Sequence, residues 1–342
     1  MKKIICLSAA LLLIAALAAC SPEHEVPDLP SEPESGTHEQ AESTENQTEE
    51  SKETDDVSGL PIINAGETAT ELSIYMSKQG GPAYIPKDFT VSDREGETNV
   101  AKGLVVIGPD GSEYVWIPTS ETELARRDFG SYFSSYDSFA SYFDETDTEE
   151  FRSMAASVEK YGGFYFSRYE VSQGKGDVPL SVPVTEDNPG TVWVRFSPQD
   201  SVKVCSRLYE DNDTVTGFFP YGCNYDTVLQ WLVDSGCLDI VDVKRDSTSW
   251  GNYSNDTFSE GARGNYTGKW EEAKTNNIYD LAGNNWEWTR ERSGSNYVMR
   301  GGGYNLMGGD CQGYIYPAAI RDPLPGNNHH PNVAFRSALF IN

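Results

Sequence analysis

The chain has 342 residues and a formal net charge of −27, because 53 acidic side chains outnumber 26 basic ones. Proteins that bind nucleic acid present basic surfaces to the phosphates, so this balance argues against a nucleic-acid partner. The apolar and aromatic content is adequate for a proper hydrophobic core, which argues against a chain that is disordered throughout.

The first 19 residues have the three parts of a secretory signal. Lys2 and Lys3 supply the positive charge, residues 4–16 are apolar, and small residues precede Cys20. The apolar run is too short to span a bilayer. Its ending resembles the bacterial lipobox, which implies that Cys20 is acylated and anchors the mature protein to the cell envelope, outside the cytoplasm. A plain secretory signal with a coincidental cysteine is the alternative.

An acidic stalk is predicted for residues 20–62. Ser21 to Leu60 contains thirteen acidic residues, four prolines, one basic residue (Lys52) and no aromatic residue. Such a segment buries too little apolar surface to offset its chain entropy, and its like charges repel one another. As a random coil it would reach roughly 35 Å, enough to hold a domain away from a membrane. An acidic interaction tail is the other interpretation.

Residues 63–342 remain for folding, and four cysteines lie among them. Export permits disulfides, but four cysteines allow three fully paired connectivities, and the sequence neither selects one nor excludes free thiols. Their spacing does not fit the paired C-x-x-C pattern of metal sites. The four are Cys205, Cys223, Cys237 and Cys311.

The first predicted elements form a hairpin. Val100 to Ile107 and Glu113 to Ile117 are apolar runs with strand character, separated by a turn at residues 109–111 that contains Pro and Gly. Aromatic residues then recur every three or four positions from Phe129 to Phe143, which is a helical period. That stripe is interpreted as packed against the domain, with a ligand-facing aromatic lid as the alternative.

Three helices, a strand and a long loop follow. Thr148 is the predicted N-cap of a helix that stops at Gly162-Gly163, and Phe164 to Glu170 alternates as a strand. A second helix begins at Ser197 and Pro198, with Cys205 on its core face, and a third covers Asn224 to Leu238. Asp246 to Gly268 lacks periodicity and is predicted to be loop. Together, these helices, strands and loops predict one α+β domain whose C-terminal half, residues 163–342, is loop-rich.

Three short motifs carry a family resemblance. They are Asp280-Leu281-Ala282-Gly283-Asn284-Asn285-Trp286-Glu287-Trp288, Arg300-Gly301-Gly302-Gly303-Tyr304 and Val333-Ala334-Phe335-Arg336. Their combination and order resemble the formylglycine-generating enzyme (sulfatase-modifying factor) family, and weaker matches extend the resemblance to roughly 180 residues. The resemblance implies a divergent C-type-lectin-like fold. Ala334 departs from the family, which usually has Gly before Phe-Arg.

The first motif predicts a structural calcium site. Asp280 and Glu287 offer carboxylates, and the main-chain oxygens of Gly283 and Asn285 lie between them in a segment that favours irregular backbone. Hard oxygen ligands suit Ca²⁺, and the family resemblance implies the same four positions as ligands. The alternative is that Trp286 and Trp288 are core residues and the acids only cap turns.

The catalytic site that the resemblance implies is incomplete. Enzymes of the family hold copper through two cysteines five residues apart, and these positions fall on Leu306 and Cys311. A leucine cannot ligate copper, so we expect neither a copper site nor oxidase activity of that type. His329 and His330 are adjacent on a predicted loop, where histidines are more often solvent-exposed than bound to metal.

A ligand-binding face is predicted on the C-terminal loops, residues 304–332. Its tyrosines supply rigid amphipathic area, its apolar residues supply contact, and its amides and acid supply hydrogen bonds to a protein or glycan. Any single residue of this face could instead be an ordinary loop residue or part of the core. The candidates are Tyr304, Asn305, Leu306, Met307, Asp310, Gln312, Tyr314, Ile315, Tyr316 and Asn327. Arg321 and Arg336 are predicted to anchor loops through buried ion pairs instead.

The preferred function is therefore a surface-displayed, lipid-anchored binding protein. A lectin-like scaffold that ends in such loops also resembles the variable proteins of diversity-generating retroelements, some of which are lipoproteins. Two alternatives stay open: a divergent oxygen-dependent enzyme that uses Cys311 with a thiol supplied elsewhere, and a structural envelope protein that binds a neighbour constitutively.

Overall fold

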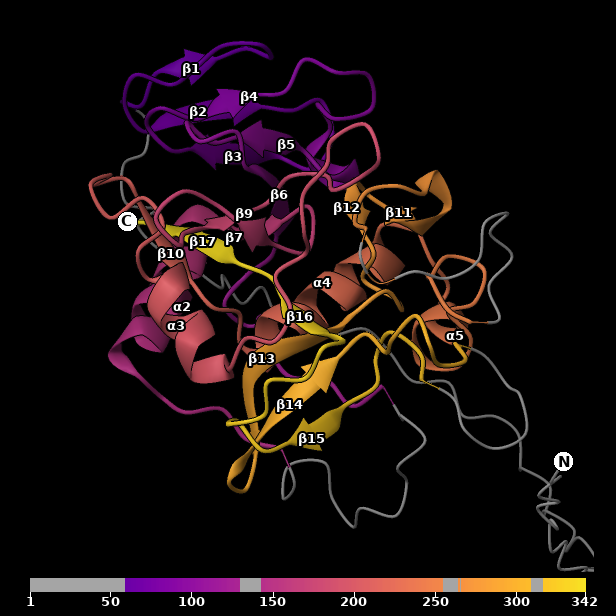
Figure 1. The fold of residues 1–342 in the computed structure, drawn as a ribbon. Helices are drawn as coiled ribbons and strands as arrows, with labels where there is room; N and C mark the ends of the chain where they lie inside the picture. The colour runs from indigo at the N-terminus through magenta and orange to yellow at the C-terminus, as the bar shows by residue number, and fades with distance from the viewer. Residues whose placement is uncertain (1–58, 130–142, 255–263, 265, 309–315) are drawn as a thin grey trace, which may run out of the picture. The chain divides into compact units, whose positions relative to one another are not determined.

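The computed structural model describes residues 59–129, 143–254, 264, 266–308 and 316–342. All of them belong to one compact unit, Glu53–Asn342. Short strands predominate over helices, and long irregular connections join them (Figure 1). The prediction of a mixed, loop-rich fold is thus confirmed at this coarse level, with sheets predominating. No helix in the part of the chain described is both long and apolar enough to cross a membrane.

A six-stranded antiparallel sheet forms the centre of the unit. Its order is β10-β17-β7-β6-β5-β4, so the C-terminal strand β17 lies between two strands from the middle of the chain. The strands are β4 Thr90–Val91, β5 Val105–Ile107, β6 Glu113–Pro118, β7 Gly163–Ser167, β10 Val215–Phe218 and β17 Ala338–Ile341.

Both faces of this sheet are buried, as the alternation along β6 shows. Tyr114 and Trp116 belong to one buried cluster, which includes residues of helix α3 (Pro198–Cys205). Val115 and Ile117 belong to a second cluster, with residues of α2 (Glu149–Tyr161) and α4 (Gly222–Asp234). Successive strand residues point to opposite faces, so a strand covered on both sides is apolar throughout.

The helix signals in the sequence act as predicted. The Thr148 hydroxyl accepts a hydrogen bond from Phe151 N at the start of α2, and Gly162 ends that helix at φ +73°. Ser197 caps α3 in the same way by accepting from Asp200 N. Cys205 is fully buried on α3, as its position on the core face predicted.

Several boundaries differ from the prediction. Of the predicted strand Val100 to Ile107, the first part is the 3₁₀ helix η1 (Val100–Lys102), because the Asn99 side chain accepts from Ala101 N and Gly103 turns the chain at φ +92°. The hairpin itself is confirmed, since β5 pairs with β6. The strand predicted for residues 164–170 ends at Ser167, whose hydroxyl donates to Tyr169 O.

The helix predicted for residues 224–238 is shifted. It begins at Gly222, where Tyr221 N donates to the Asn224 side chain, and it ends at Asp234 ahead of Gly236 at φ +68°. The short helix α5 (Ile240–Lys244) was not predicted. The described residues of the loop predicted for 246–268 form no helix or named strand. Phe129 and Phe143 are buried, and residues 130–142 of the predicted aromatic helix lie outside the described residues.

A four-stranded sheet, order β15-β14-β13-β16, carries the motifs. It consists of β13 (Trp286–Ser293), β14 (Asn296–Arg300), β15 (Asp322–Leu324) and β16 (Val333–Phe335). β13 and β16 pair in parallel, and the other neighbours pair antiparallel. In Figure 1, β13, β14 and β15 lie together below the central sheet. The three sequence motifs are therefore brought to one sheet.

The remaining elements are short. A three-stranded sheet contains β1 (Ile62–Ile63), β2 (Ser73–Met76) and β3 (Pro82–Ile85). Two hairpins contain β8 (Ser172–Gln173) with β9 (Pro179–Leu180), and β11 (Lys274–Thr275) with β12 (Ile278–Tyr279). The 3₁₀ helix η2 (Glu271–Ala273) precedes β11. The three described cysteines, Cys205, Cys223 and Cys237, are free thiols.

Candidate functional site

The first motif joins β12 to β13 in an irregular segment. Asp280, Gly283 and Asn284 have φ values of +60°, +70° and +53°. A Cβ on Gly283 would lie 2.2 Å from the main-chain oxygen of Asn252, so this close approach requires glycine. The backbone here is therefore held by contacts with the preceding loop and does not form a regular ladder.

The two predicted carboxylate ligands are buried, and each has one oxygen without a partner. Asp280 Oδ2 accepts from Thr267 Oγ1 at 2.9 Å and from Gly268 N at 2.8 Å. Glu287 Oε1 accepts from Arg336 Nε at 2.7 Å. Asp280 Oδ1 and Glu287 Oε2 have no hydrogen-bond partner among the described residues. An unpartnered buried oxygen is costly, so each of these two calls for a ligand.

Glu170 is a third buried acid at this place, and the sequence reasoning missed it. Its carboxylate accepts from Asn285 N at 3.0 Å and from the side-chain amides of Asn284 and Asn285, both at 2.8 Å. It thus holds the motif's backbone in place. Its position at the end of the apolar run 164–170 was the signal that could have identified it.

Burial makes this group of acids electrostatically strained. Desolvation raises the pKa of Asp280 to about 6 and that of Glu287 to about 7, with Arg336 acting in the opposite direction on both. Burial raises the pKa of Glu170 well above its ordinary value, and the charges of Glu287 and Asp280 add to that rise. Arg336 is the one guanidinium that acts on all three carboxylates, so a bound cation would lower the cost of their charge.

The donor set fits a hard cation only if main-chain oxygens contribute. No group of three or more His, Cys, Asp or Glu side chains in the described ranges is arranged to hold a metal by itself. Two carboxylate oxygens without partners, together with the carbonyls of Gly283 and Asn285, would make an all-oxygen set of the kind that calcium prefers.

The second motif is held by a buried network of four charged side chains. Arg300 Nη2 lies 2.6 Å from Asp226 Oδ1, and Arg321 Nε lies 2.8 Å from Glu291 Oε1. Arg321 also pairs with Asp226, and Arg300 with Glu291. The prediction that Arg321 and Arg336 anchor loops through buried ion pairs is confirmed.

A cavity of about 280 Å³ opens beside these motifs, on the predicted ligand-binding face. Its wall combines aromatic, aliphatic, amide, imidazole and carboxylate groups. The lining residues are Trp286, Met299, Asn305, Leu306, Tyr316, Asp322, Leu324, His330, Asn332 and Val333. The rings of Trp286 and Tyr316 meet edge to face with centroids 5.8 Å apart.

Three of the predicted ligand-binding residues line this cavity: Asn305, Leu306 and Tyr316. Tyr304 lies beside it and donates its hydroxyl to Asn332 Oδ1 at 3.3 Å. Met307 is 43% exposed, and Asn327 is exposed without lining the cavity. Asp310, Gln312, Tyr314 and Ile315 lie outside the described residues, as does Cys311.

The other lining residues were missed because pairing between strands brings them there. Met299 of β14 stands opposite Asp322 of β15 in the antiparallel register. His330 was expected to be solvent-exposed; its neighbour His329 is exposed, whereas His330 is half-buried in the cavity wall, where its Nδ1 accepts from Asn332 N. Trp286 and Val333 belonged to motifs already singled out.

A larger cavity, of about 610 Å³, lies elsewhere, at the turn after α3. Several of its polar side chains already have partners: Tyr209 donates to Asp110 at 2.8 Å, Arg207 donates to Gly176 O, and Asn212 donates to Lys87 O. Its size alone therefore does not make it the better site, because these three polar side chains are engaged within the protein.

Comparisons with known proteins leave the family undecided. No family model matches the chain, and no curated protein matches it. Among solved structures, CarF is similar over 53% of this chain and 87% of its own, with 12% identity and a TM-score of 0.35. Treponema denticola variable protein 1 is similar over 78% of this chain and 98% of its own, with 13% identity and a TM-score of 0.26. Fold and site define a loop-rich protein of mixed strands and helices, with sheets predominating, that has a small amphipathic cavity.

Proposed function

We propose that this chain is a lipid-anchored binding protein of the cell envelope that recognises its ligand through the cavity on its C-terminal loops. The observation that carries the proposal is the cavity of about 280 Å³ whose wall includes Asn305, Leu306 and Tyr316. Ligand sites are typically apolar hollows with a few polar groups that fix orientation, and this wall has that composition.

The size of the cavity limits what it takes. Sites for drug-sized ligands have volumes of about 300 to 1,000 Å³, so this one suits a single chemical group of a larger ligand. The exposed Met307 beside it would add contact area outside the cavity. A protein or glycan that inserts one group and spreads over the neighbouring loops fits both features.

We further propose a scaffold of the formylglycine-generating-enzyme type, with a C-type-lectin-like fold stabilised by calcium. Its support is the order of the three motifs and the two oxygens without partners on Asp280 and Glu287. Ala334 replaces the usual glycine inside strand β16, where the backbone does not require glycine, so this departure does not weigh against the scaffold. Bound calcium would hold loops that few ladder hydrogen bonds support.

Catalysis of the family's type is not part of the proposal. Leu306 stands at one of the two copper-ligand positions and contributes its side chain to the cavity wall instead. A thioether or thiolate is what copper(I) prefers, and an alkyl side chain offers no ligand atom. The cavity would then serve binding only.

The proposal that the loops are diversified concerns the source of the ligand specificity. It rests on the position of a binding face near the C-terminus, where the variable proteins of diversity-generating retroelements have theirs. Sequencing the neighbouring DNA tests it: a reverse-transcriptase gene and a near-copy of the last part of this gene that differs at adenines would support it, and their absence would remove it.

A binding screen tests the function. The mature chain, with Cys20→Ser to omit the lipid, would be applied to glycan and surface-protein arrays with calcium and with chelator. Leu306→Trp, which fills the cavity, should abolish binding of the ligand that the array identifies, and Ile62→Trp, at an exposed position in β1, serves as the matched control. Binding that persists in Leu306→Trp would place recognition elsewhere.

A further inference from the structure

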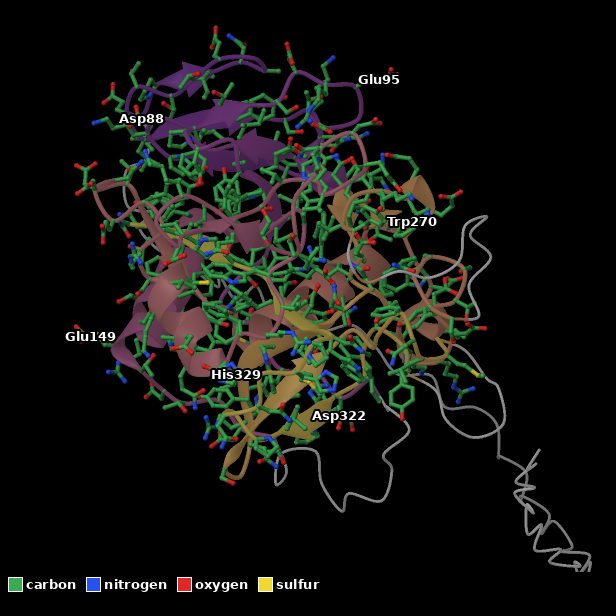
Figure 2. The ribbon with its side chains drawn as sticks, in the orientation of Figure 1. Asp88, Glu95, Glu149, Trp270, Asp322 and His329 are labelled. Carbon is green, nitrogen blue, oxygen red and sulfur yellow. The ribbon has the colours of Figure 1, made fainter. Side chains whose placement is uncertain are left out.

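Asp322 contributes a carboxylate to the wall of the small cavity. Among the described residues that line this cavity there is no other aspartate and no glutamate, lysine or arginine. Asp322 begins the edge strand β15 and is labelled beside that sheet in Figure 2. No ion pair or side-chain hydrogen bond to this carboxylate occurs in the described ranges, although the residue is only partly exposed. Burial raises the pKa of Asp322.

The adjacent guanidinium does not neutralise Asp322. Arg321 pairs instead with Glu291 and Asp226 in the buried network. The remaining polar groups of the cavity are the amides of Asn305 and Asn332 and the imidazole of His330, whose Nδ1 accepts from Asn332 N. Among the described residues, the negative charge of Asp322 in this wall therefore has no cationic partner.

Two aromatic rings stand in the same wall. Trp286 begins β13, and Tyr316 meets it edge to face. Aromatic faces attract organic cations, and tryptophan attracts them most strongly. A carboxylate and aromatic rings together form the kind of site that binds an ammonium or guanidinium group.

We infer that this cavity takes the cationic end of a basic side chain, a guanidinium or alkylammonium group, presented by a protein partner. Asp322 is the counter-ion, and Trp286 and Tyr316 are the aromatic wall. The inference rests on the proposed function, because it names the ligand class for the same cavity. The volume fits one side-chain end, and the acidic balance of the chain favours a basic partner.

The test compares matched probes on the mature chain with Cys20→Ser. N-acetyl-arginine methylamide and N-acetyl-lysine methylamide are the cationic probes, N-acetyl-citrulline methylamide is the neutral isostere of the first, and N-acetyl-glutamate methylamide is the anion. Isothermal titration should give at least tenfold tighter binding of a cationic probe than of citrulline, and no binding of the anion. Equal binding of arginine and citrulline probes, or no binding of either cation, overturns the inference.

Variants connect the preference to the cavity. Asp322→Asn should remove the tenfold preference for the cation, whereas Asp93→Asn, at an exposed position in the N-terminal part, should keep it. Tyr316→Leu should weaken the cationic probes more than citrulline, which provides a second measurement if Asp322→Asn does not fold. A preference that survives both variants overturns the inference.

Failure of the inference and failure of the proposed function give different results. If the array ligand carries no cation and Leu306→Trp blocks it, the binding function stands and the cationic ligand is wrong. If Leu306→Trp leaves the array ligand bound, the cavity itself is not the site. Titrating a free diamine such as putrescine in parallel distinguishes a small-amine ligand from a protein side chain. If putrescine binds more tightly than both the arginine and the lysine probes, the inference of a protein partner is overturned.

Discussion

At the scale of single residues, the buried charges divide by whether the protein pairs them. Arg300 and Arg321 form a closed network with Asp226 and Glu291, in which both oxygens of each acid have a partner. Asp280 and Glu287 are equally buried, yet each keeps one oxygen free. Removing a charge from the first group would leave its partner buried and unpaired, whereas the second group has two oxygens that the described residues do not satisfy.

Glu145 is an acid of a third kind, with only 9% of its side chain exposed, and it gives a pH prediction. Desolvation, with the nearby charge of Glu291, raises its pKa to about 7, although it accepts from Cys223 N at 2.8 Å. The folded state therefore favours the protonated form. The stability from this group is fully present below the unfolded pKa of 4.5 and is lost as the pH rises through about 7.

Glu145→Gln should therefore stabilise the protein more at pH 8.5 than at pH 5.5, by about 2 kcal/mol. Urea unfolding of both proteins at the two pH values measures the difference. Glu95→Gln, at an exposed position that Figure 2 labels, should show no such pH dependence. A Glu145→Gln effect of equal size at both pH values would contradict the raised pKa.

Gly283 gives a second prediction at this scale, because its conformation and its surroundings both require glycine. Gly283→Ala would combine φ +70° with a contact of 2.2 Å to Asn252 O, and we expect a loss of more than about 2 kcal/mol in the free energy of unfolding. Gly294 has a similar φ of +58° but open space around it, so Gly294→Ala should lower the free energy of unfolding by only about 1 kcal/mol. Denaturant titration compares them; equal losses would mean that the close approach to Asn252 is relieved without cost.

At the scale of elements, what could be predicted was local. The caps of α2 and α3 follow from Thr148, Gly162 and Ser197, whose effects reach only three or four residues along the chain. The 3₁₀ helix η1 was mistaken for strand because its apolar residues suit either state, and the Asn99 cap decides. Asp322 could not be predicted as a site residue, because the pairing of β15 with β14 brings it to the cavity.

The cap of α2 gives the prediction for this scale. Thr148→Ala removes the hydrogen bond from Phe151 N at 3.0 Å and the contact with the Tyr221 hydroxyl at 2.8 Å. We expect a loss of about 1 to 2 kcal/mol in stability. Thr148→Ser keeps the hydroxyl and should therefore retain most of the wild-type stability, as measured by thermal unfolding. If Thr148→Ser and Thr148→Ala lose the same amount of stability, the methyl group of Thr148, and not its capping hydroxyl, supplies that stability.

At the scale of the whole molecule, the two sheets have different tasks. The central sheet is buried on both faces and builds the core, whereas the sheet of β13 to β16 brings three separated motifs and the cavity wall together. The sequence predicted which motifs belong to one site through their resemblance to a family. It could not predict the cavity's walls, because these depend on how the second sheet is assembled.

The N-terminal prediction concerns where the molecule resides. If Cys20 is acylated, the mature protein should partition with membranes, and Cys20→Ala should leave unprocessed precursor or release the protein to the soluble fraction. Fractionation with mass spectrometry of the N-terminus measures both. Cys6→Ala, inside the predicted signal, is the matched control and should leave processing unchanged. Cleavage at another residue with a free Cys20 thiol would remove the anchor.

The calcium prediction joins the residue and molecular scales, because one ion would satisfy two buried carboxylates and hold the loops that carry the cavity. A ligand that binds only the folded state adds about 2.7 kcal/mol at a hundredfold excess over its Kd. Calcium added to metal-free protein should therefore raise the melting temperature, and EDTA should reverse the rise.

The decisive measurement is the calcium-dependent increment in melting temperature, since the variants change stability by themselves. Asp280→Asn keeps the shape of the side chain that meets Thr267 and Gly268 but removes its charge, and it should abolish the increment. Glu287→Gln should do the same, although it also removes the buried negative charge that pairs with Arg336 and lowers the starting stability. Glu95→Gln should keep the full increment. If metal-free wild-type protein melts identically with and without calcium, the two unpartnered oxygens are not a calcium site, and bound water is the remaining way to satisfy them.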